Sequence, residues 1–157
     1  KKIDERKILS DYTSNGKGMV VGYELFNKIG LTLYQDERIV IYTNVIATKQ
    51  KSIGNLLLKR VDLIFTDEII DLVSLLEILD IGFGIRGGDY LTYRNIVELL
   101  AKTYTDDNFK QVIGDIRYKY STIVKLNELL NRLNINNFCL DLYQQLLNVN
   151  QRKEYTL

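Results

Sequence analysis

The chain of 157 residues contains no histidine and no proline, and its only cysteine is Cys139. Without histidine it cannot build a Ser-His or Cys-His nucleophile of its own, nor a metal site that depends on imidazole ligands. A single cysteine excludes an internal disulfide and a cysteine-rich zinc site. It is typical of a reducing, intracellular setting, above all the cytoplasm.

Long hydrophobic runs are also missing. No apolar run approaches the roughly 18 residues that a membrane span needs, and no signal-peptide pattern follows Lys1. A membrane protein is therefore not expected. Hydrophobic residues make up 46% of the chain and charged residues 26%, the balance of a soluble globular protein with one domain-sized core.

The net charge of +1 hides an asymmetry. Residues 1–60 contain eleven basic and six acidic residues (+5), whereas the remainder contains ten basic and fourteen acidic residues (−4). A basic flank of this kind suits binding to a nucleic acid or to an acidic protein, and an ordinary solvated lysine-rich surface is the competing interpretation. This part contains four tyrosines: Tyr12, Tyr23, Tyr34 and Tyr42. Their rings either stack on the bases of a nucleic acid or pack half-buried against the rest of the protein.

Residues 1–65 are predicted to form a β-rich and helical N-terminal extension. Residues 31–34 and 38–42 are rich in β-formers and are separated by three polar residues, which indicates a β-hairpin. Apolar residues between 53 and 64 follow a period of 3.6, which predicts a helix. Thr66 or Asp67 then caps a second helix. One face of that helix is formed by Ile69, Leu72, Val73 and Leu76.

Residues 66–157 alternate between short apolar runs and helical patterns. Helices are predicted over 91–104, with an apolar stripe of Ile96, Leu99 and Leu100, and over 121–133. The second helix is expected to bury five side chains: Ile123, Leu126, Leu129, Leu130 and Leu133. Short strands are predicted over 78–81, 109–113 and 138–140. This order is typical of an α/β fold with a Rossmann-like parallel sheet and crossover helices.

The segment 76–89 reads LEILDIGFGIRGGD, which we interpret as a buried strand that enters a glycine-rich turn. Gly82, Gly84 and Gly87 satisfy the G-x-G-x-x-G spacing, which lets a backbone bend sharply and approach a ligand without a Cβ. Asp115 follows the next predicted strand, where an acid is expected to bind ribose hydroxyls. The segment therefore predicts a site for a nucleotide-like cofactor.

LEILDIGFG, QVIGDI and FCLDL, in this order, resemble the first three strands of the class I S-adenosylmethionine-dependent methyltransferase superfamily. The resemblance covers residues 68–145, the N-terminal part of that family's domain, so the later strands and the catalytic residues would lie beyond this chain. It implies S-adenosylmethionine as the cofactor. By this resemblance Asp80, Gly82, Phe83 and Gly84 surround its methionine part, Asp115 binds the ribose, and Ile116, Asp141 and Leu142 contact the adenine.

Three functions are left open by these patterns. The first is methyl transfer, or cofactor binding by a methyltransferase-like domain, with a nucleic acid bound through residues 1–60. The second is a non-catalytic α+β interaction or regulatory protein that binds nucleic acid or an acidic protein. The third, an NAD-type Rossmann enzyme, is disfavoured by the long interval between the glycines and Asp115. A purely structural alternative makes 67–79 one amphipathic helix capped by Gly82, with 84–88 as a connection.

Overall fold

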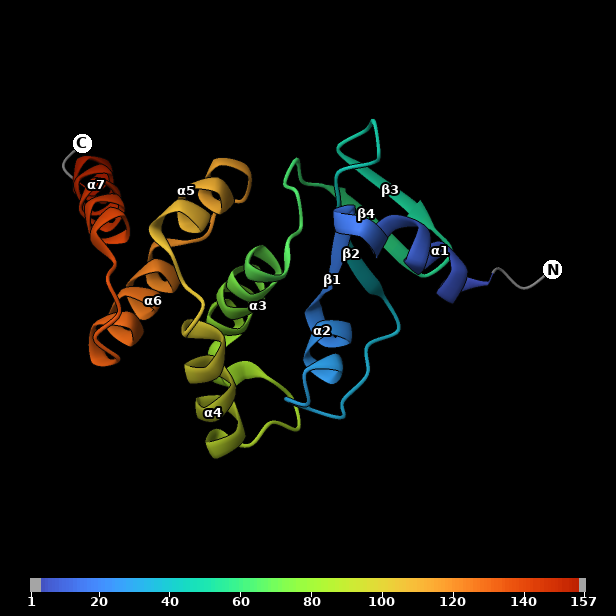
Figure 1. The fold of residues 1–157 in the computed structure, drawn as a ribbon, viewed down its shortest axis with the longest axis horizontal. Coiled ribbons are helices and arrows are strands. Elements are labelled where there is room, and N and C mark those ends of the chain that lie inside the picture. Colours follow the sequence, from blue (N-terminus) through green and yellow to red (C-terminus); the bar gives the residue numbers. More distant parts are fainter. Residues whose placement is uncertain (1–3, 156–157) are drawn as a thin grey trace.

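The computed structural model describes residues 4–155, and from residue 151 onward only the course of the backbone. The strands and two helices come first: α1 (Glu5–Thr13), the 3-10 turn η1 (Ser14–Gly16), β1 (Gly18–Val21), α2 (Gly22–Lys28), β2 (Ile39–Thr43), β3 (Gln50–Ile53) and β4 (Leu56–Arg60). A helical half follows: α3 (Asp67–Ile81), the 3-10 turn η2 (Gly82–Gly84), α4 (Tyr90–Ala101), α5 (Asp106–Asp115), α6 (Tyr120–Arg132) and α7 (Phe138–Tyr155). Figure 1 shows the two halves side by side, with α3 between the sheet and the other helices.

The four strands form one mixed sheet in the order β1-β2-β4-β3. β2 and β4 are parallel, whereas β1 pairs with β2 and β3 pairs with β4 in antiparallel directions. Leu56, Leu57 and Leu58 of β4 are all buried, as expected for an inner strand covered on both faces. α1 and α2 contact β1 and β2, and Tyr42 of β2 reaches Glu77 of α3.

The N-terminal part is β-rich as predicted, but its hairpin consists of other residues. β3 and β4 pair around Gly54, whose φ of 57° supplies the positive dihedral of a two-residue turn. The helix predicted between 53 and 64 is therefore wrong. Residues 31–34 form no strand. Leu31 and Thr32 are buried where this segment meets the loop after α3. Only the run at 38–42 becomes a strand, β2.

α3 is the central element of the core. The Thr66 hydroxyl accepts a hydrogen bond from the N–H of Ile69, which confirms the predicted cap. The predicted face is confirmed as well, since its four members are all buried: Ile69, Leu72, Val73 and Leu76. α3 contacts α4, α5 and α6 and also α2 and β1, so the helical half and the sheet share its side chains.

The parallel sheet with crossover helices predicted for residues 66–157 is not formed in the described part of that range. Residues 78–81 are the last turn of α3, 109–113 lie within α5, and 138–140 begin α7. The physical reason is visible in α5, where Phe109 and Val112 are fully buried one helical turn apart and Thr105 caps the first turn. The coarser expectation, a fold of both helices and strands, is confirmed.

The two predicted helices at 91–104 and 121–133 are confirmed as α4 and α6. α6 buries four of the five expected side chains, Ile123, Leu126, Leu129 and Leu130, whereas Leu133 at its end is only partly buried. In α4 the expected stripe is partly wrong, because Leu99 is 63% exposed and Val97 and Ala101 face the core instead. Between residues 4 and 155, no helix has both the length and the apolarity to cross a membrane.

Candidate functional site

The glycine-rich segment is a helix end and a loop, as in the structural alternative. α3 ends at Gly82, which has a φ of 61° and donates its N–H to the carbonyl of Ile78. Gly87 has a φ of 72°, and a Cβ added there would lie 3.0 Å from the hydroxyl oxygen of Thr32. Glycine is needed at both positions because the backbone is left-handed and, at Gly87, closely opposed.

This loop is tied to the segment that follows α2. The hydroxyl of Thr32 donates to the carbonyl of Arg86, and the N–H of Arg86 donates to the hydroxyl of Tyr23 at 3.2 Å. The Arg86 guanidinium donates to the Tyr34 hydroxyl at 3.0 Å and lies 5.2 Å from the centre of that ring. The loop therefore has a defined position against the sheet half of the molecule.

Three aromatic rings gather where the loop meets α4. The ring of Phe83 is stacked on Tyr90 with centroids 5.7 Å apart and lies 5.4 Å from Tyr93. Phe83 is 78% exposed and Tyr90 is 61% exposed, so the cluster presents ring surface to solvent. Exposed aromatic rings that are already packed against each other form a rigid platform for a planar ligand.

Two cavities flank this cluster. One of about 210 Å³ lies between the loop and α4, and the other, of about 330 Å³, lies between α4 and α6. Four of the lining residues are common to both cavities: Gly82, Phe83, Tyr90 and Tyr93. We name the two cavities together the glycine-loop groove. A larger hollow of about 530 Å³ near the end of α4 is lined by no aromatic residue.

Basic side chains line the α6 side of the groove. Arg94, Lys125 and Arg132 border the larger cavity together with one acid, Glu128. The ammonium group of Lys125 donates to the carbonyl of Leu79 at 3.2 Å, which satisfies a free carbonyl at the end of α3. Arg94 and Arg132 share one carboxylate, that of Glu98, at 3.2 and 3.5 Å. With Glu98 counted beside Glu128, the three positive and two negative charges leave a local net charge of +1.

Of the eight residues predicted to bind a cofactor, only some meet at the groove. Gly82 and Phe83 line it, and Gly84 completes the same turn. Asp80 lies one turn earlier on α3 and faces α6, where it accepts a hydrogen bond from Thr122 at 2.7 Å and lies 3.9 Å from the ammonium group of Lys119.

The other four predicted residues belong to other helices. Asp115 is the last residue of α5, and Ile116 follows it as the cap. Asp141 and Leu142 lie in the first turns of α7, where Asp141 accepts hydrogen bonds from Asn127 and Gln145. None of these four lines either cavity of the groove. The predicted ribose and adenine contacts are therefore not brought together with the glycine turn.

The aromatic and basic neighbours of Phe83 were not predicted from the sequence. Tyr90 and Tyr93 are three residues apart at the start of α4, so both lie on the side of the helix that faces the loop. That spacing is a signal that the sequence contains. Lys125 and Arg132 come from α6, and only the packing of α6 beside α3 and α4 brings them to the groove.

A separate polar cluster lies between α3 and the sheet. The Tyr42 hydroxyl donates to the Glu77 carboxylate at 3.1 Å, and the buried Tyr118 hydroxyl has no hydrogen-bond partner among the described residues. Burial raises the pKa of the Glu77 carboxyl, although the nearby hydroxyls of Tyr118 and Tyr42 act in the opposite direction. The pKa values of both tyrosines are raised, mainly by burial.

The raised pKa of Glu77 predicts a pH-dependent contribution to stability. A carboxyl whose folded pKa exceeds its unfolded pKa stabilises the fold at acid pH, and this contribution is lost as the pH rises through the folded pKa. Glu77→Gln, which keeps an acceptor for Tyr42, should therefore gain free energy of unfolding relative to the wild type as the pH rises from acid to neutral. Urea unfolding across that range measures the difference, with exposed Glu128→Gln as the matched control. A difference that falls with rising pH would contradict the assignment.

Comparisons with known proteins do not add a family to this picture. No model of a known protein family matches the chain, and no curated protein or solved structure matches it. Among the side chains that the structure describes, those of residues 4–150, no cluster of three or more potential metal ligands is present. The groove's own rings and charges are thus the basis for a functional proposal.

Proposed function

We propose that this chain is a non-catalytic binding protein whose glycine-loop groove takes single-stranded nucleic acid. The observation that carries the proposal is Phe83, a ring that is 78% exposed yet held in place by Tyr90 and Tyr93. Bases stack on such rings with about 1–3 kcal/mol per base, and they do so in any sequence.

The charges of the groove suit the phosphates of the same ligand. Arg94, Lys125 and Arg132 stand beside the rings, so a strand whose base covers Phe83 can direct its backbone toward them. The two cavities of about 210 and 330 Å³ share four lining residues, so a strand that lies across the surface can contact both.

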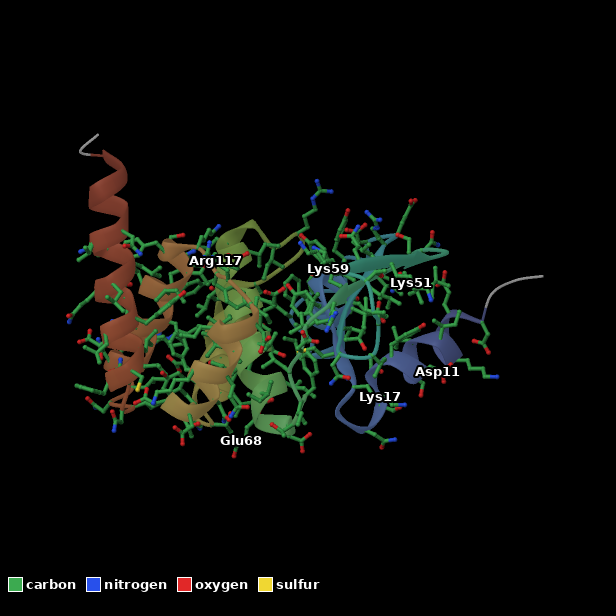
Figure 2. All side chains as sticks on the ribbon, turned by 90° about the horizontal axis from the view of Figure 1, so that it is seen from above. Asp11, Lys17, Lys51, Lys59, Glu68 and Arg117 are labelled. Carbon is green, nitrogen blue, oxygen red and sulfur yellow. The ribbon has the colours of Figure 1, made fainter. Side chains whose placement is uncertain are left out.

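Basic residues of the sheet half supply a second contact for a longer strand. Figure 2 shows Lys17, Lys51 and Lys59 on this half, and none of the three forms an ion pair with a described residue. Lys1 and Lys2, which contribute to the basic excess of residues 1–60, lie outside the described residues. We place the protein in the cytoplasm, where its one cysteine stays reduced.

Fluorescence anisotropy with a labelled homopolymeric oligonucleotide of about twelve nucleotides, within the range of known single-strand sites, tests this proposal. Binding should be saturable, should weaken as salt rises, and should exceed binding of a duplex of equal length. No binding at low salt would contradict the proposal. Binding of a labelled Tyr- and Glu-rich peptide, with no binding of the oligonucleotide, would favour an acidic protein partner instead.

S-adenosylmethionine is a second candidate ligand, because two residues that the resemblance assigns to its binding, Gly82 and Phe83, line the groove. Its adenine offers the same stacking surface as a nucleobase, and methyl transfer would be the associated activity. S-adenosylhomocysteine at millimolar concentration should then raise the Tm. A Tm shift that Phe83→Ala removes, without oligonucleotide binding, would replace the first candidate by this one.

A further inference from the structure

The outer face of α7 carries an apolar stripe, which we name the α7 stripe. Its four side chains are about half to two thirds exposed and follow one another at intervals of four, four and three residues: Phe138 (66%), Leu142 (46%), Leu146 (64%) and Val149 (49%). These intervals place them on one side of a helix. The opposite side packs on the core through Leu140, Tyr143 and Leu147. α7 is thus apolar on two sides, and one of them has no partner within the described chain.

We propose that the α7 stripe is an interface on which a second copy of this chain docks with its α7 antiparallel. The stripes of two copies can pack against each other without charge repulsion, because Asp141 is the only charged residue from 138 to 150. The Asp141 carboxylate already accepts hydrogen bonds from Asn127 and Gln145. A two-fold contact requires one surface to be complementary to itself, and a stripe with neutral Gln and Asn neighbours meets that requirement.

Other occupants fit the stripe less well. An acidic or basic protein partner would find no matching charges along residues 138–150. A membrane surface is bound by helices whose polar face is rich in lysine and arginine along its length. In α7 the only basic residues, Arg152 and Lys153, follow one another after the last residue of the stripe. The stripe is separate from the groove, since no residue of α7 lines either of its cavities. Figure 1 places α7 at the end of the molecule remote from the sheet.

The geometry also sets the strength and the orientation of the dimer. The stripe has four side chains along about 17 Å of helix, at 1.5 Å per residue. A standard interface uses roughly 20–30 residues on each partner, so this contact is small. The dimer should therefore be weak and should form only as concentration rises. In the antiparallel arrangement the two-fold axis passes between Leu142 and Leu146, so Phe138 of one copy lies near Val149 of the other.

Sedimentation velocity from low micromolar to near-millimolar concentration tests the interface on the full chain. The wild type should shift from monomer to dimer, and Leu146→Glu should remain monomeric over the whole range. Leu33→Glu, at a 93% exposed leucine in the loop after α2, should dimerise like the wild type. A wild type that stays monomeric, or a Leu146→Glu variant that dimerises equally well, would overturn the proposal. So would flotation of the wild type with phosphatidylcholine and phosphatidylglycerol vesicles that Leu146→Glu abolishes.

Cysteine cross-linking tests the orientation. Gln145→Cys in a Cys139→Ser background places a thiol close to the two-fold axis, so mild oxidation should yield a disulfide-linked dimer. The native Cys139 lies away from the axis, and its two copies should not cross-link in the wild type. Cross-linking through Cys139 but not through Gln145→Cys would overturn the antiparallel arrangement.

Discussion

Replacing Phe83 by alanine is expected to weaken binding of single-stranded nucleic acid by about 5- to 140-fold. The loss of one stacked base costs roughly 1–3 kcal/mol, and each 1.4 kcal/mol corresponds to a factor of ten in Kd. Phe83 is 78% exposed, so its truncation should change the free energy of unfolding by no more than about 0.5 kcal/mol. Anisotropy titrations give the change in Kd, and urea unfolding shows that the fold is retained.

Phe138→Ala is the matched control for this substitution. It removes the same ring from a position with similar exposure, 66%, on a helix that does not line the groove. The control should bind the oligonucleotide as tightly as the wild type. Unchanged binding by Phe83→Ala, or an equal loss in both variants, would show that Phe83 is not the stacking surface.

Leu76→Ala is expected to lower the free energy of unfolding by about 2–5 kcal/mol. Leu76 is fully buried on α3, so the change removes transfer free energy and leaves a cavity that its neighbours fill only in part. Because α3 contacts elements of both halves, the sheet and the helices should still unfold together. Urea unfolding followed by circular dichroism and by tyrosine fluorescence measures both effects.

Leu99→Ala makes the same change at a leucine of α4 that is 63% exposed, and it should cost less than about 0.5 kcal/mol. Two results would contradict a core shared through α3. One is a cost at Leu76 no larger than that at Leu99. The other is a Leu76→Ala variant in which the helices unfold while the strands remain.

The predictions that the structure confirms depend on residues that are close together in the sequence. The cap at Thr66, the buried face of α3 and the buried face of α6 follow from residues within one or two helical turns of each other. The strand predicted at 78–81 failed because a short apolar run fits both a strand and the last turn of a buried helix. Packing of α3 between the sheet and α6 decides between them, and that packing involves distant residues.

The same distinction applies to the groove. The glycine spacing predicts a bend in the chain at Gly82 and Phe83, and the structure has a bend there. The bend proved to be a helix cap, and its partners Lys125 and Arg132 come from a helix that no local pattern connects to it. Asp115 and Asp141 were grouped with the glycines by order along the chain, and the fold places them on other helices.

Tryptophan fluorescence at position 83 tests the central claim most directly, because the chain contains no tryptophan of its own. In Phe83→Trp, a base that stacks on the indole should quench its emission, and the quenching should saturate at the oligonucleotide concentration that saturates anisotropy. The same reporter in Leu33→Trp, at a side chain 93% exposed to solvent, should remain unquenched. Saturable quenching at position 83 alone is the result that the proposed groove predicts. Equal quenching at both positions, or oligonucleotide binding without quenching at position 83, would contradict it.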